Sequence, residues 1–64
     1  MNDEKHFSTF EVHLMLNARA GEEIPEYRLW TLMECWRIRR GLPDTHGQNG
    51  FTKAEADDFL RYAY

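Results

Sequence analysis

One stretch in the middle of the chain carries the clearest structural pattern, and residues 25–41 read PEYRLWTLMECWRIRRG. The proline fits the first turn of a helix, and the glutamate after it complements the positive end of the helix dipole. Three arginines gather at the other end, where Gly41 followed by Pro43 stops the pattern. The sequence therefore predicts a helix over residues 25–40, and the turn-rich residues 42–50 predict a loop after it.

This predicted helix carries apolar residues on two faces, whereas a helix at the edge of a small domain needs only one. The first stripe consists of Leu29, Leu32, Met33 and Trp36. Nearly opposite, at spacings of three and four, lie Tyr27, Trp30, Thr31, Glu34 and Ile38. Two arrangements account for the pattern. Either the helix lies between two others that cover both faces, or the second face meets a partner or a second copy of the chain.

Downstream of the loop, a second helix start is visible. Thr52 and Glu55 have the spacing of a capping box, and Phe51 and Ala56 occupy the two positions of a hydrophobic staple. We therefore expect a helix over residues 53–63. Its inner face would be formed by Ala56, Phe59, Leu60 and Ala63.

The segment upstream of the middle helix allows two interpretations. Ser8 and Glu11 have the spacing of a capping box and Gly21 suits a helix end, which predicts a helix over residues 9–20. Apolar and polar residues also alternate over residues 10–16, as in a strand, which would have to pair with a second copy because no other strand is evident. We favour the helix, because the caps at both ends agree with it. One stripe of that helix would hold Phe7, Phe10, Leu14 and Ala18.

These elements predict a single all-α domain over residues 1–64, with three helices around one core. The alternative is an N-terminal strand followed by two helices, in a dimer. Residues 1–6 are polar, and we expect them to fray. A chain of 64 residues is too short for a Rossmann domain or a barrel.

Aromatic residues make up 14% of this short chain. A chain of this size buries only about 60% of the surface that its unfolded form exposes. The single cysteine excludes a disulfide within the chain, so no covalent staple supports the core. We therefore expect a partner protein or self-association to shelter part of the aromatic surface.

Charge is distributed unevenly along the chain. Residues 26–40 hold four bases and two acids, whereas the whole chain has a net charge of −3. The arginines of the middle helix either pair with the acidic flanks or form a basic patch. Such a patch would suit a DNA-binding transcriptional regulator, with contacts from Arg28, Arg37, Arg39 and Arg40. The net negative charge argues against phosphate binding, but it suits docking on a basic, nucleic-acid-handling protein.

The residues with metal-binding or catalytic chemistry do not form a recognisable site. Residues 44–55 have the length of an EF-hand loop, with Asp44 first and Glu55 last, but most intermediate ligand positions lack carboxylates. The histidines and Cys35 have no zinc-site spacing, and no phosphate-binding loop or nucleophile motif occurs. We therefore predict no metal, no cofactor and no enzymatic activity.

The sequence thus predicts a small non-enzymatic protein that binds another protein, as an adaptor or an inhibitor, with self-association as a further expectation. The expected contact residues are Tyr27, Trp30, Glu34, Arg37 and Ile38. No apolar run approaches the ~20 residues of a membrane span, and no signal-peptide pattern is present. We therefore expect a cytoplasmic protein.

Overall fold

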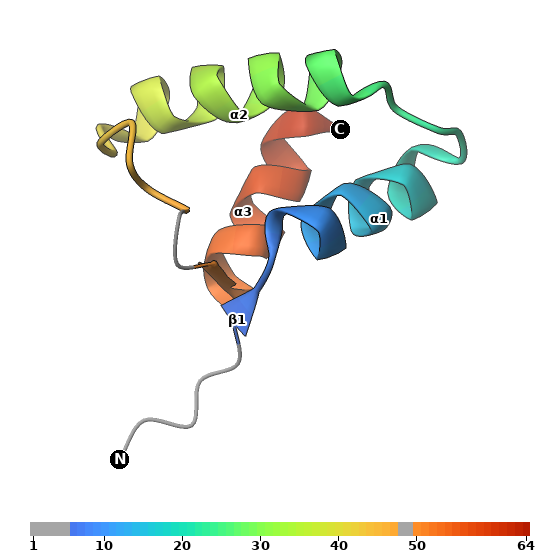
Figure 1. The fold of residues 1–64 in the computed structure, drawn as a ribbon, viewed down its shortest axis with the longest axis horizontal. Coiled ribbons are helices and arrows are strands. Elements are labelled where there is room, and N and C mark those ends of the chain that lie inside the picture. Colours follow the sequence, from blue (N-terminus) through green and yellow to red (C-terminus); the bar gives the residue numbers. More distant parts are fainter. Residues whose placement is uncertain (1–5, 48–49) are drawn as a thin grey trace.

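A computed structural model of the protein describes residues 6–47 and 50–64, which form three helices and a short two-stranded sheet (Figure 1). In chain order, the elements are β1 (His6–Phe7), α1 (Thr9–Ala20), α2 (Glu26–Arg40), β2 (Phe51–Thr52) and α3 (Lys53–Ala63). The prediction of a small three-helix protein is confirmed.

The two capping boxes expected from the sequence are both formed. Ser8 Oγ accepts the Glu11 amide at 3.1 Å, and the Glu11 carboxylate accepts the Ser8 amide at 2.8 Å. Thr52 and Glu55 repeat the arrangement at 3.1 and 3.0 Å. α2 begins differently, because its N-cap is Pro25, whose side chain makes no capping hydrogen bond.

The strand interpretation of residues 10–16 is wrong, because these residues lie within α1. The all-α prediction also needs a correction, since β1 and β2 form a short antiparallel pair in which Phe7 faces Phe51. Each strand leads directly into the N-cap of a helix, so the pairing holds the starts of α1 and α3 together. His6, which we expected to fray, belongs to β1, and residues 1–5 of that segment lie outside the described residues.

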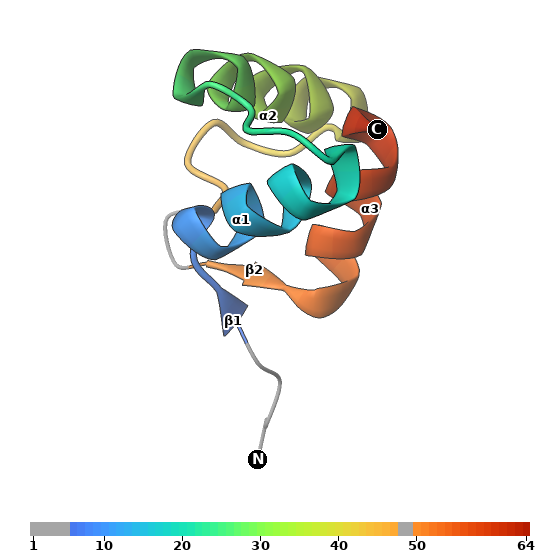
Figure 2. The same cartoon turned by 90° about the vertical axis from the view of Figure 1, so that its right-hand side faces the viewer.

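α3 packs against both other helices and both strands, so it occupies the centre of the fold. In Figure 1, α2 runs across the top of the molecule with α1 and α3 below it, and Figure 2 shows the same order from the side. Of the two arrangements that the sequence allowed for α2, the one that places it between the other two helices is therefore wrong. The largest side chains in the core are Trp36, Phe51, Phe59, Leu16, Leu29, Met33 and Val12, each under 2% exposed.

Each helix turns one apolar stripe to this core. The predicted inner face of α3 and the first stripe of α2 are buried, apart from Leu32 and Ala63, which are half-buried. α1 instead buries Val12 and Leu16. The stripe that begins at Phe7 continues through the exposed residues Phe10, Leu14 and Ala18.

Side chains of α1 fix the connection to α2. Asn17 Oδ1 accepts the Ile24 amide at 2.8 Å, and His13 Nε2 donates to the Ile24 carbonyl at 2.6 Å. Ile24 itself is buried in the core. α2, the longest helix, has 15 residues, and none of the helices in the described part of the chain is long and apolar enough to cross a membrane.

Candidate interaction surface

The second face of α2 is exposed to solvent. Tyr27 is 75% exposed, Ile38 is 70% exposed and Trp30 is 47% exposed. Residues three and four apart are neighbours on a helix surface, so these side chains share one side with Glu34. The α2 surface, as we name it, consists of the predicted contact residues Tyr27, Trp30, Glu34, Arg37 and Ile38.

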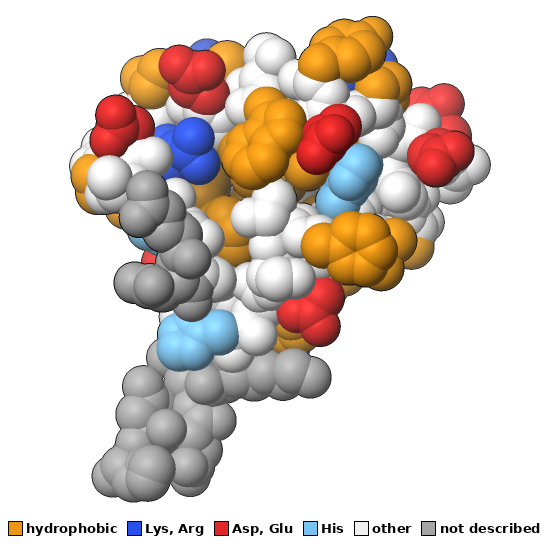
Figure 3. Space-filling model, viewed as in Figure 1, with side chains coloured by type: hydrophobic (Ala, Val, Ile, Leu, Met, Phe, Trp, Pro, Cys, Tyr) orange, Lys and Arg blue, Asp and Glu red, His pale blue; other side chains and the backbone are white. Residues whose placement is uncertain are grey.

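α1 adds exposed apolar side chains that were not among the predicted contacts. Phe10 is 68% exposed and Leu14, one turn later, is 50% exposed. Figure 3 shows hydrophobic side chains over both α1 and α2 on one face of the molecule. The signal was present in the sequence, because the alternating apolar residues between Phe10 and Leu16 cannot all share one helix face. A helix that buries Val12 and Leu16 must therefore expose Phe10 and Leu14.

A pocket of about 240 Å³ lies beside Trp30, between α2, the start of α1 and the loop after α2. Its apolar lining comes from the partly exposed Trp30, with the buried side chains of Met33 and Phe51 behind it. Its polar lining comes from Thr9, Arg37, Asp44 and His46, together with the backbone at Gly47. Figure 3 shows the surface hollowed below α2. Two predicted contact residues therefore form part of a concave site.

His46 anchors the loop that closes this pocket. Its Nε2 lies 2.8 Å from Glu55 Oε2, and since a carboxylate accepts, Nε2 donates. The ring makes edge contacts with Trp36 and Phe51, both with centroids 5.6 Å away. Nδ1 is buried and has no hydrogen-bond partner among the described residues.

Glu55 serves the capping box and His46 at the same time. Burial raises the pKa of Glu55, but hydrogen bonds from His46 and Thr52 outweigh it and hold the pKa below its ordinary value. The last position of the EF-hand-like segment is thus already occupied by protein donors. Gln48, which would supply a middle ligand, lies outside the described residues.

The four arginines considered for DNA contacts do not converge on one side of α2. Arg28 and Arg37 are nine residues apart, which places them on opposite sides of a helix with 3.6 residues per turn. Arg40 is held by Asp58 through bonds of 2.7 and 3.0 Å. The guanidinium of Arg39 lies 6.0 Å from the centre of the Tyr62 ring.

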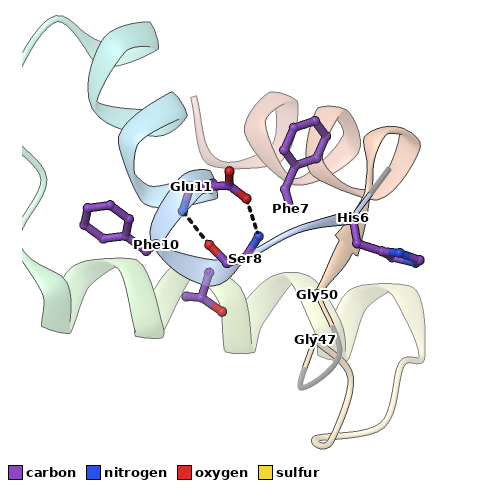
Figure 4. A pocket seen from close by; sticks show the side chains of 8 residues that line it. His6, Phe7, Ser8, Phe10, Glu11, Gly47 and Gly50 are labelled. Atoms are coloured by element: carbon purple, nitrogen blue, oxygen red, sulfur yellow. Dashed lines mark hydrogen bonds between the residues drawn. The ribbon is translucent and has the colours of Figure 1, made fainter. Parts of the chain in front are cut away.

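A shallower recess of about 600 Å³ surrounds the start of α1. Figure 4 shows that two of its polar residues, Ser8 and Glu11, are engaged with each other in the capping box. The same view shows Phe7 and Phe10 projecting away from each other. The exposed residues of this recess also include Phe10 and His6.

Groups of chemical interest are sparse in the part of the chain that the structure describes. Within residues 6–47 and 50–64, no three His, Cys, Asp or Glu side chains gather in a way that could hold a metal ion. Cys35 is a free, exposed thiol on α2. The strongest feature is thus the apolar face with its pocket. No protein-family model, curated protein or solved structure matches this chain.

Proposed function

We propose that this protein is a small non-enzymatic interaction module, which binds another protein molecule through the α2 surface and acts as an adaptor or an inhibitor. The observation that carries the proposal is the contrast between two tryptophans on one helix. Trp36 is 1% exposed, whereas Trp30 is 47% exposed and stands beside an open pocket.

The extent of the apolar face supports this function. With about 150–250 Å² for each aromatic side chain, the exposed fractions of Phe10, Tyr27 and Trp30 amount to roughly 300–475 Å². The largest apolar patch on a typical monomeric protein is about 300–600 Å² and is often functional, so the exposed rings fall in the size range of such a patch. This estimate leaves out the aliphatic side chains of Leu14 and Ile38, which enlarge the exposed apolar area.

The residue types of the α2 surface also fit a protein-binding function. Tyr, Trp and Arg are enriched among the residues that dominate binding energy at interfaces. Arg37 lies in the pocket wall and forms no ion pair among the described residues. A partner that presents an apolar side chain next to a carboxylate would satisfy both the pocket and this cation.

Affinity capture with a matched pair of variants tests the proposal. Tyr27→Ala removes an aromatic ring from the α2 surface, and Tyr64→Ala removes a ring of similar exposure (67%) at the C-terminal end of α3. The protein retained by the wild type, once purified and titrated, is expected to bind Tyr27→Ala about tenfold or more weakly. Tyr64→Ala should bind like the wild type, and equal binding by all three proteins would contradict the proposal.

A further inference from the structure

We infer that a second copy of this chain covers the apolar face, in a two-fold arrangement in which Phe10 of each copy enters the pocket beside Trp30 of the other copy. The inference rests on the proposed function and names the partner of the same surface. It follows from the fit between an exposed ring and a pocket that lie next to each other on one molecule.

The size of the pocket suits a single side chain. Its volume of about 240 Å³ is below the roughly 300–1,000 Å³ of typical small-molecule sites. Trp30 provides the exposed apolar wall, with the buried side chains of Met33 and Phe51 behind it, so a phenyl ring would exchange water contacts for packing on the indole ring. The pocket is also more enclosed than the recess at the start of α1.

Phe10 is the side chain best placed to fill such a pocket in another copy. It is 68% exposed and projects from the first turn of α1 (Figure 4). Its neighbour Thr9 lines the pocket, so the ring begins one residue away from the pocket wall. A two-fold axis that passes between such a pair brings each ring to the other copy's pocket, and one favourable contact is made twice.

Charge favours the same arrangement. Glu11 follows Phe10, and one of its carboxylate oxygens, Oε1, accepts the Ser8 amide, whereas no hydrogen bond to the other oxygen is seen among residues 6–47 and 50–64. Arg37 in the pocket wall is the cation that an inserted Phe10 would bring near Glu11. Asp44 also lines the pocket and repels a carboxylate, so the attraction for Glu11 is confined to the side of the pocket that Arg37 forms. More broadly, α2 holds four Arg and two Glu, whereas the remaining residues hold four bases and nine acids.

The available area indicates a reversible dimer. A standard-size interface buries about 800 Å² on each partner, which is about one-sixth of this protein's 4592 Å² surface. The exposed rings of Phe10, Tyr27 and Trp30 supply only part of that area. We therefore do not expect a permanent dimer. We expect a dimer that forms and dissociates with concentration, within the range that sedimentation analysis covers.

Sedimentation equilibrium on the full chain tests the inference with three variants. Phe10→Ala removes the ring but leaves the pocket, Trp30→Ala opens the pocket but leaves the ring, and Tyr64→Ala is the matched control. We expect the dimer dissociation constant to rise at least tenfold for the first two variants and to stay unchanged for the control. Circular dichroism on each variant checks that the helices are intact.

Two further measurements are specific to reciprocal insertion. A mixture of Phe10→Ala and Trp30→Ala should form more dimer than either variant alone, because the mixed pair keeps one ring facing one intact pocket. In a mixture of isotope-labelled and unlabelled wild type, nuclear Overhauser effects should connect the Phe10 ring of one copy to the Met33 methyl group of the other.

The outcomes separate this inference from the proposed function. A wild type that stays monomeric at millimolar concentration overturns the inference, and so does a dimer that Phe10→Ala leaves intact. If Tyr27→Ala still weakens capture of a different protein in either case, the proposed function stands without a second copy. If the protein is monomeric and no capture depends on Tyr27, both fail.

Discussion

The indole Nε1 of Trp36 donates a hydrogen bond of 2.8 Å to Asp58 Oδ2, which joins the core-facing side of α2 to α3. The same carboxylate accepts two hydrogen bonds from Arg40. A tryptophan ring buried to 1% exposure needs a partner for its single polar group, and Asp58 provides it. The contact between α2 and α3 therefore depends on the Asp58 carboxyl group, which titrates.

Asp58→Ala should therefore destabilise the protein more than Asp58→Asn. The alanine variant leaves the Trp36 N–H without its acceptor, and an unpaired buried donor costs about 1–3 kcal/mol. The asparagine variant keeps an oxygen that accepts from the indole, and it loses mainly the exposed ion pair with Arg40. Urea denaturation followed by tryptophan fluorescence gives the free energies of unfolding. Equal losses in the two variants would show that the ion pair, rather than the indole bond, is the stabilising contact.

Acid should weaken the fold through the same carboxylate. Hydrogen bonds from Arg40 and Trp36 hold the pKa of Asp58 at about 2, below its ordinary value of 3.8. The unfolded chain regains the ordinary pKa, so it takes up the proton first as the pH falls. The stabilisation from Asp58 is thus complete above the ordinary pKa and is lost as the pH falls through about 2.

The lowered pKa of Glu55 acts in the same direction at acidic pH. Unfolding free energies measured between pH 5 and pH 2 should accordingly decline for the wild type. Asp58→Asn should show a shallower decline over the same range, because it has removed one of the two contributing carboxyls. A wild type and an Asp58→Asn variant with parallel pH profiles would contradict this assignment.

The two tryptophans of α2 should respond differently to truncation. Trp36→Ala removes a fully buried ring and should cost about 3–5 kcal/mol, which is enough to unfold many domains of this size. Trp30→Ala removes a half-exposed ring and should cost about 1 kcal/mol, in the range of ordinary substitutions outside the core. Thermal unfolding by circular dichroism distinguishes the two, and similar melting curves would show that Trp30 is part of the core.

The helices were predictable because their signals are local. Ser8 and Thr52 cap the helices that follow them, and Gly21 and Gly41 end α1 and α2 in the left-handed conformation. The pairing of β1 with β2 was not predictable, since strands of two residues have no periodicity to detect. The two strands are also distant from each other along the chain.

The exposed face of α2 was predicted only as one of two arrangements. Both faces of the helix carry large apolar or aromatic side chains, and only the packing decides whether the second face is covered. That α3 rather than α2 occupies the centre depends on how all three helices meet. The pocket escaped prediction for a related reason, because Thr9, Met33 and Phe51 come from segments far apart in sequence and meet only in the folded chain.

DNA binding should be absent at ~50 mM salt, where phosphate contacts are strong. Arg28 and Arg37 lie on opposite sides of α2, and Asp58 neutralises Arg40. A gel-shift titration with generic duplex DNA provides the measurement, and a variant with alanine at all four positions (Arg28, Arg37, Arg39 and Arg40) is the control. A shift that the wild type shows and this variant lacks would favour the regulator hypothesis over the proposed function.

Gly47 and Gly21 form a matched pair for testing how tightly the loop after α2 is packed. Both have positive φ, at 97° and 75°, so alanine at either position carries the cost of a left-handed conformation, about 1–2 kcal/mol. A Cβ on Gly21 would meet nothing within 4 Å, whereas one on Gly47 would lie 2.8 Å from the ring of Phe51. Because that ring is 1% exposed and cannot move without disturbing the core, Gly47→Ala should cost about 1–3 kcal/mol more than Gly21→Ala. Denaturant titrations of both variants measure the difference, and equal free energies of unfolding would mean that the loop shifts away from Phe51 at no cost.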